Sequence, residues 1–229
     1  MVTSAAAACG YNARMRPALV SHLDWPQQLA DGLAAMSLAL DAGQQVSLLG
    51  YLELLQRWNK VYNLTAVRDP AVMVRRQLLD SLSIVPWVDA GPVLDIGTGA
   101  GLPGIPLAIA CPQRAFSLLD SNGKKTRFVQ QAAAELGLDN VEVIKGRVEG
   151  LDRRGHYARI TSRAFATLAD MVAGSSPLLA PGGRWLAMKG AAPLAEIREL
   201  PNGLRTEVVE LEVPGEVGHR HLVLIDRDG

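Results

Sequence analysis

The sequence predicts an α/β protein: a doubly wound, mostly parallel sheet preceded by a small helical subdomain. Three observations support this prediction. Apolar residues recur at three- and four-residue steps between residues 25 and 88. After residue 91, short apolar runs alternate with helical ones, and the last two apolar runs have no helix between them. These patterns are typical, in turn, of helices, of parallel strands joined by helical crossovers, and of an antiparallel hairpin.

The helical subdomain is expected over residues 25–90. Apolar helical faces lie within residues 29–40 and 48–58, separated by a turn at residues 41–43. Asp69 and Pro70 predict the start of a third helix that runs to about residue 85, because Asp caps helices and Pro fits the first turn.

The sheet domain is expected over residues 91–229, with helices at residues 123–136 and 168–179. A short turn rich in Gly and Pro joins the last two strands, which predicts an antiparallel hairpin at the edge of the sheet. The seven predicted strands are residues 92–95, 115–120, 141–145, 158–161, 184–189, 205–213 and 221–226.

Composition excludes several classes of protein. The 229 residues carry 23 Lys+Arg against 23 Asp+Glu, which excludes a strongly cationic nucleic-acid coat protein but not a local basic face. Cys9 and Cys111 are too few for a disulfide framework or a four-thiolate zinc site, and the histidines are scattered. The longest uncharged stretch, residues 96–113, contains four Gly and three Pro, so it is no membrane span. We therefore expect a soluble cytoplasmic protein without a metal, and a disordered extension at residues 1–24.

A glycine-rich loop follows the first predicted strand and opens a helix. Gly97, Gly99 and Gly101 allow positive φ angles and close approach of a ligand to the backbone. Asp95 faces this loop, where it would repel a pyrophosphate but favour a ligand that carries an amino group and a sulfonium. Asp120 ends the second strand, where a carboxylate can accept both ribose hydroxyls. These residues favour S-adenosylmethionine as the cofactor. The alternative is a tight strand-to-helix turn in which Asp95 only caps the helix.

Ten short segments spread over residues 25–227 form a specific pattern when taken in order: residues 57–60, 62–65, 79–81, 95–99, 101–106, 119–121, 147–149, 162–165, 189–190 and 220–223. With these segments the chain resembles the bacterial glucose-inhibited division protein B family over residues 25–227. Three positions depart from the pattern of the family: Ala100 replaces a frequent proline, Gln77 an expected histidine, and Ala158 an acidic residue.

The resemblance implies a Rossmann-like S-adenosylmethionine-dependent methyltransferase. It also implies methylation of guanine N7 in the decoding-region (530) loop of 16S rRNA, free or within small-subunit particles, by a monomer. The cofactor contacts that carry over are Gly97, Leu102, Val148, Glu149 and Arg163. Arg163 has three open roles: the cofactor carboxylate, an RNA phosphate, or a structural salt bridge. Because N7 is a free ring lone pair, in-line transfer needs alignment but neither a general base nor a covalent intermediate. We therefore expect no catalytic residue beyond an electrostatic role for Arg163.

A local basic surplus indicates where RNA binds. Residues 51–76 carry five cations against two carboxylates, although a solvated helix surface is the alternative. Trp58 and Tyr62 lie four residues apart, and we expect both in the core rather than in a base-stacking platform. The candidate RNA contacts are Arg57, Lys60, Arg75, Arg76, Lys124, Lys125, Arg127 and Lys189.

Three other functions stay open from the residues alone. A small-molecule methyltransferase would need a lid over an apolar pocket, whereas the helical segment is basic. A non-catalytic scaffold would not need an intact cofactor loop. A dehydrogenase is disfavoured by Asp95 beside the would-be phosphate loop.

Overall fold

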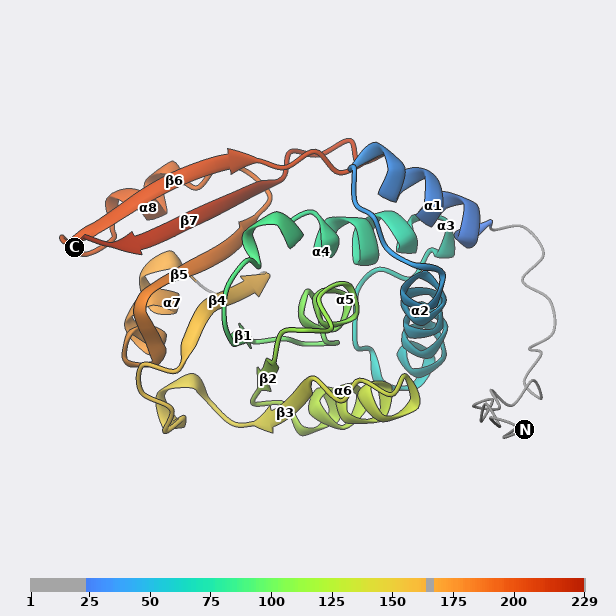
Figure 1. The fold of residues 1–229 in the computed structure, drawn as a ribbon, viewed down its shortest axis with the longest axis horizontal. Coiled ribbons are helices and arrows are strands. Elements are labelled where there is room, and N and C mark those ends of the chain that lie inside the picture. Colours follow the sequence, from blue (N-terminus) through green and yellow to red (C-terminus); the bar gives the residue numbers. More distant parts are fainter. Residues whose placement is uncertain (1–23, 164–166, 229) are drawn as a thin grey trace, which may run out of the picture.

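The computed structural model describes residues 24–163 and 167–228 (Figure 1). Its centre is a seven-stranded sheet with the order β3-β2-β1-β4-β5-β7-β6. Strands β1 to β5 are parallel, and β7 runs antiparallel to both β5 and β6. The predicted parallel sheet with an antiparallel C-terminal hairpin is therefore confirmed. The strands are β1 (Val93–Ile96), β2 (Phe116–Asp120), β3 (Val141–Lys145), β4 (Tyr157–Arg163), β5 (Leu179–Lys189), β6 (Leu204–Glu210) and β7 (His221–Arg227).

Polar caps fix where most of the longer helices begin. Asp41 and Gln44 form a reciprocal capping box at the start of α2, and Thr167 and Asp170 form another at α7. Asn122 accepts from the backbone N–H groups of the first turn of α6. The helices are α1 (Trp25–Ala35), α2 (Ala42–Tyr62), α3 (Pro70–Met73), α4 (Asp80–Leu82), α5 (Gly104–Ala110), α6 (Gly123–Glu135), α7 (Leu168–Ser175) and α8 (Leu194–Arg198). Short 3-10 turns are η2 (Val85–Trp87), η3 (Val148–Gly150) and η4 (Ser176–Leu178).

The third predicted helix begins as expected, with Asp69 as its cap, but its interior is irregular. The π-helical segment η1 (Val74–Leu79) separates α3 from α4, and α4 ends at Leu82. A π segment carries an extra residue per turn and is frequent at functional sites. Here it contains Gln77 and leads directly into Asp80, two polar residues that are buried.

Two hydrophobic clusters cover the two faces of the sheet. The larger cluster joins α1, α2, η1, α5 and α6 to one face, and the smaller joins α7 to the other. Figure 1 shows α2 and α5 on the opposite side of the sheet from α7. The N-terminal helices thus share a core with the sheet. The domain limits proposed from the sequence stay a prediction, and residues 1–23 of the expected extension lie outside the described residues.

Two segments near the C-terminus differ from the prediction. Residues 168–179 are not one helix, because Pro177 supports only the short turn η4 before β5 begins at Leu179. Strand β6 ends at Glu210, and residues 211–220 form a long connection rather than a short turn. Leu211 and Val213 of this connection are buried in the larger cluster with the N-terminal helices. Figure 1 shows the connection reaching toward α1.

Candidate functional site

The glycine loop between β1 and α5 is closed by its own hydrogen bonds. Thr98 O accepts from the N–H groups of Gly101 and Leu102, and Gly97, Gly99 and Gly101 all have positive φ. Gly104 is required for a different reason. A Cβ on Gly104 would lie 2.2 Å from Leu118 Cδ2 and 2.8 Å from Asp95 Oδ2, so any side chain there would force these buried atoms to move.

Asp95 lies fully buried at the end of β1 and holds this loop. Its Oδ2 accepts from Thr98 Oγ1 at 2.6 Å and from Gly104 N at 3.0 Å. Its Oδ1 is buried without a hydrogen-bond partner in the described part of the chain. Burial raises the pKa of Asp95 to about 7, against the lowering effect of these two hydrogen bonds. Asp95 therefore caps the start of α5, which agrees with the alternative of a tight strand-to-helix turn. Its Oδ1 accepts no hydrogen bond from the described residues.

Asp120 ties the loop to the end of the neighbouring strand. Its Oδ2 accepts from Gly99 N at 2.9 Å, and its Oδ1 accepts from Asn122 N at 2.8 Å. Each oxygen keeps a second lone pair that can accept another hydrogen bond. Because β1 and β2 are parallel neighbours, both acidic residues lie at the carboxyl edge of the sheet, where open α/β sheets bind ligands.

A pocket of about 300 Å³ opens at this edge. Gly97 lies on one side of it, Asp120 at the end of β2, and Val148 and Glu149 after β3. Val148 is buried and Glu149 is exposed, so the pocket has an apolar wall and a polar rim. Its volume lies at the lower end of the range for small-molecule sites, about 300–1,000 Å³. The pocket therefore combines the size of a small-ligand site with both polar and apolar lining.

A family profile shows to which protein family the chain belongs. The profile of GidB, described as rRNA small subunit methyltransferase G, matches residues 44–223. The chain belongs to this family. Family and fold together make it an S-adenosylmethionine-dependent methyltransferase.

Curated relatives agree over nearly the whole chain. "Ribosomal RNA small subunit methyltransferase G" of Marinobacter nauticus is 56% identical over 91% of this chain and 98% of its own length. The protein of the same name from Pseudomonas aeruginosa is 51% identical over 87% of this chain and 94% of its own.

Solved structures of low identity share the fold. TrmN from Thermus thermophilus has a TM-score of 0.54 at 20% identity, covering 75% of this chain and 52% of that one. A SAM-dependent methyltransferase from Aquifex aeolicus has a TM-score of 0.52 at 17% identity, covering 69% of this chain and 93% of that one.

The structure brings only part of the expected cofactor set to one pocket. Gly97, Asp120, Val148 and Glu149 line it together. The residues outside its lining are Asp95, Gly99, Gly101, Leu102 and Arg163. Leu102 is buried in the larger core cluster, and Gly99 acts through its N–H bond to Asp120. Lys125, a predicted RNA contact, also lines this pocket.

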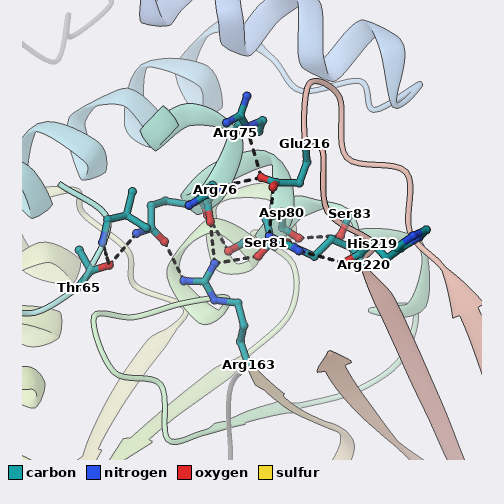
Figure 2. A network of polar contacts seen from close by, with 12 residues as sticks. Thr65, Arg75, Arg76, Asp80, Ser81, Ser83, Arg163, Glu216, His219 and Arg220 are labelled. Carbon is teal, nitrogen blue, oxygen red and sulfur yellow. Dashed lines mark hydrogen bonds and ion pairs between the residues drawn. The ribbon is translucent and has the colours of Figure 1, made fainter. Parts of the chain in front are cut away.

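Arg163 lies at the end of β4 in a polar network with the π segment (Figure 2). Its Nη1 donates to Asp80 Oδ2 and to Arg76 O, both at 2.9 Å, and its Nη2 donates to Gln77 Oε1 at 2.8 Å. The amide of Gln77 also donates to Thr65 Oγ1. Of the three roles open to Arg163, the salt bridge is the one with contacts in the structure.

The same network reaches the connection between β6 and β7. Asp80 Oδ1 accepts from Arg220 Nε at 3.0 Å, and Glu216 lies within 3.5 Å of the guanidinium groups of Arg75, Arg76 and Arg220. The Glu216 side chain is only 5% exposed. Burial favours its neutral form, yet the three arginines outweigh burial and lower the pKa of Glu216. Asp80, Glu216 and Arg220 were not candidate residues; Asp80 and Arg220 lie in segments that carried the family resemblance.

A second pocket, of about 470 Å³, lies beside this network. Thr65, Gln77, Asp80 and Arg163 line one side, and Lys189 and His221 the other. It opens at the ends of β4 and β5, so the two pockets share the carboxyl edge of the sheet.

The predicted RNA contacts divide into two groups. Arg57, Arg75, Arg76 and Lys189 pair with carboxylates. In contrast, Lys60, Lys124, Lys125 and Arg127 make no ion pair with the described residues. Tyr62 is 40% exposed, so its expected place in the core is wrong, whereas half-buried Trp58 does pack against the core.

No helix in the described ranges is both long and apolar enough to cross a membrane. Among the same residues, no three side chains of His, Cys, Asp or Glu gather as a metal site. Cys111 is a buried free thiol at the end of α5, in agreement with a packing role.

Proposed function

We propose that the chain transfers a methyl group from S-adenosylmethionine to N7 of a guanine in the decoding-region (530) loop of 16S rRNA. Membership of the rRNA small subunit methyltransferase G family is the observation that carries this proposal. The substrate is 16S rRNA, free or in small-subunit particles, and the enzyme acts as a monomer in the cytoplasm.

The pocket at Asp120 supports the choice of cofactor. Asp120 accepts the ribose hydroxyls with the lone pairs that its two backbone hydrogen bonds leave free. Val148 and Glu149 flank the adenine, with the Glu149 carboxylate available to its amino group. Asp95 is fully buried outside the lining of this pocket, so it favours the cationic end of the cofactor through the charge of its ionised form rather than by direct contact. When bound there, S-adenosylmethionine supplies the reactive methyl group.

Alignment is the main demand of the reaction. N7 of guanine presents a lone pair, so no proton leaves and no general base acts. The chain holds the donor rigidly because Tyr51, whose hydroxyl donates to Ala100 O at 2.8 Å, fixes the glycine loop from the helical side. Arg163 and Asp80 fix the end of β4 between the two pockets.

Methyl transfer with mapping of the product tests the proposal. The protein is incubated with methyl-labelled S-adenosylmethionine and 16S rRNA from cells that lack the homologous enzyme, naked or in particles. Chemical strand scission then locates 7-methylguanosine. We expect label at one guanine of the decoding-region loop. Binding of cofactor without transfer to either form of RNA would refute the substrate, and loss of cofactor binding as well would leave the scaffold function.

A further inference from the structure

Tyr62, the last residue of α2, presents a fixed aromatic ring at the surface. Its ring centroid lies 5.2 Å from that of Trp58 at an interplanar angle of 31°, and Trp58 lies 5.6 Å from Phe128 of α6. Trp58 is half-buried and Phe128 is fully buried. Tyr62 is therefore supported from the core side while 40% of it stays accessible. A supported ring loses little conformational freedom when a second ring stacks on it.

Helices α2 and α6 run antiparallel beneath this ring. Gly50 of α2 lies against Leu136, which follows α6. Trp58, eight residues after Gly50, contacts Phe128, which lies eight residues before Leu136. We infer from this spacing that Tyr62, one turn beyond Trp58, lies toward Lys124, one turn before Phe128. Lys124 lies at the start of α6, beside Lys125, which lines the pocket at Asp120.

Exposed cations lie on both of these helices. Lys124 and Arg127 are exposed on α6, and Lys60 is exposed on α2, two residues before Tyr62 and therefore on a different face of the helix. None of these three makes an ion pair within the described part of the chain, whereas Arg75 and Arg76 share Glu216. Unpaired cations around an exposed ring are the composition of single-stranded nucleic-acid sites, in which bases stack and phosphates meet Lys and Arg.

We propose that Tyr62 is a stacking platform for an unpaired nucleotide of the RNA, with Lys124 and Arg127 holding the flanking phosphates. The inference rests on the proposed function, and it specifies single-stranded RNA as the form that this surface binds. A base within a duplex has no free face for the ring. A loop nucleotide near the target guanine does.

Binding of two RNA probes tests the proposal. One is a fluorescein-labelled single-stranded oligoribonucleotide with the sequence of the decoding-region loop, and the other is the same strand annealed to its complement. Tyr62→Leu keeps an apolar side chain on Trp58 but removes the ring. We expect it to weaken binding of the single strand about tenfold, leave binding of the duplex unchanged, and leave the salt dependence unchanged. Tyr62→Phe should bind as the wild type does.

Controls separate stacking from damage to the fold. Val46→Ala changes another exposed apolar residue, 59% accessible, near the opposite end of α2 and should change neither affinity. Cofactor binding by Tyr62→Leu should equal that of the wild type. Ultraviolet cross-linking of the unmutated chain to the single strand should give an adduct on the peptide that contains Tyr62, a result independent of any variant's folding.

Equal loss on both probes, no loss on either, or adducts only on other peptides would overturn the inference. These outcomes are distinct from failure of the proposed function. If the wild type methylates 16S rRNA but Tyr62→Leu binds the single strand normally, only the stacking platform is refuted. If the wild type neither binds nor methylates RNA, the proposed function itself fails.

Discussion

Asp95 shows how burial changes the carboxyl group that closes the glycine loop. Thr98 and Gly104 occupy Oδ2, and no described residue donates a hydrogen bond to Oδ1, so the charged form is poorly stabilised. Burial consequently raises the pKa from 3.8 to about 7. The folded protein therefore binds a proton that the unfolded chain releases between these two values.

This difference predicts the pH dependence of stability at Asp95. As the pH rises from 4 to 7, the free energy of unfolding of the wild type should fall relative to that of Asp95→Asn. The asparagine does not titrate in this range. The relative change is at most about 4 kcal/mol, at 1.36 kcal/mol per pKa unit. Urea unfolding at a series of pH values measures it, with Asp139→Asn at an exposed loop as the control. If the free energies of unfolding of wild type and Asp95→Asn changed in parallel with pH, the raised pKa of Asp95 would be contradicted.

Gly104 gives a second prediction at the scale of a residue. Gly104→Ala places a methyl group 2.2 Å from Leu118 Cδ2, and overpacking of this kind costs about 1–3 kcal/mol. The matched change Gly150→Ala has no atom within 4 Å of the new methyl group and should cost much less. Thermal unfolding compares the two variants. Equal stability of both would show that the loop is not tightly packed.

At the scale of elements, hydrophobic period and capping residues predicted most of the fold. The spacing of apolar residues placed α2, α6 and the strands, and Asp69 marked its helix correctly. The π segment was not predicted, because no sequence pattern distinguishes its extra residue per turn from an ordinary helix. The network around Arg163 was missed for a related reason: its partners Gln77 and Asp80, and Arg220, which donates to Asp80, meet only after the sheet and helices pack.

The connection between β6 and β7 depends on Glu216 for its attachment to the π segment. Glu216→Gln removes the negative charge shared by Arg75, Arg76 and Arg220, and we expect destabilisation of about 1–2 kcal/mol, reduced from a buried pair by the exposure of the arginines. Hydrogen exchange should accelerate in residues 211–220 and stay unchanged in β1 and β2. Glu210→Gln, whose pair with His219 is exposed, serves as the control. Unchanged exchange in residues 211–220 would refute this role of Glu216.

Over the whole molecule, formal neutrality conceals a division of the charges. The two arginines of η1 pair with Glu216 of the C-terminal connection, whereas Lys60 at the end of α2 and Lys124 and Arg127 of α6 make no ion pair with the described residues. Sequence counts located the basic surplus but not this division, because pairing between residues 75 and 216 depends on tertiary packing.

The division predicts which cations contribute to RNA binding. Lys124→Gln should reduce the magnitude of the negative slope of log affinity against log salt by about one, since one phosphate contact is lost. Arg75→Gln should leave the slope nearly unchanged, because Arg75 is paired with Glu216. Titration of 16S rRNA fragments at several salt concentrations measures both slopes. A larger effect of Arg75→Gln than of Lys124→Gln would contradict the division.

We propose that the pocket at Asp120 holds the methyl donor for transfer to rRNA. Methyl transfer by Asp120→Asn, measured at saturating RNA with varied S-adenosylmethionine, tests this assignment. We predict a rise in the KM for S-adenosylmethionine of about tenfold or more with methylation still at the same guanine, because the ribose loses a charged acceptor. An unchanged KM would show that the donor binds elsewhere.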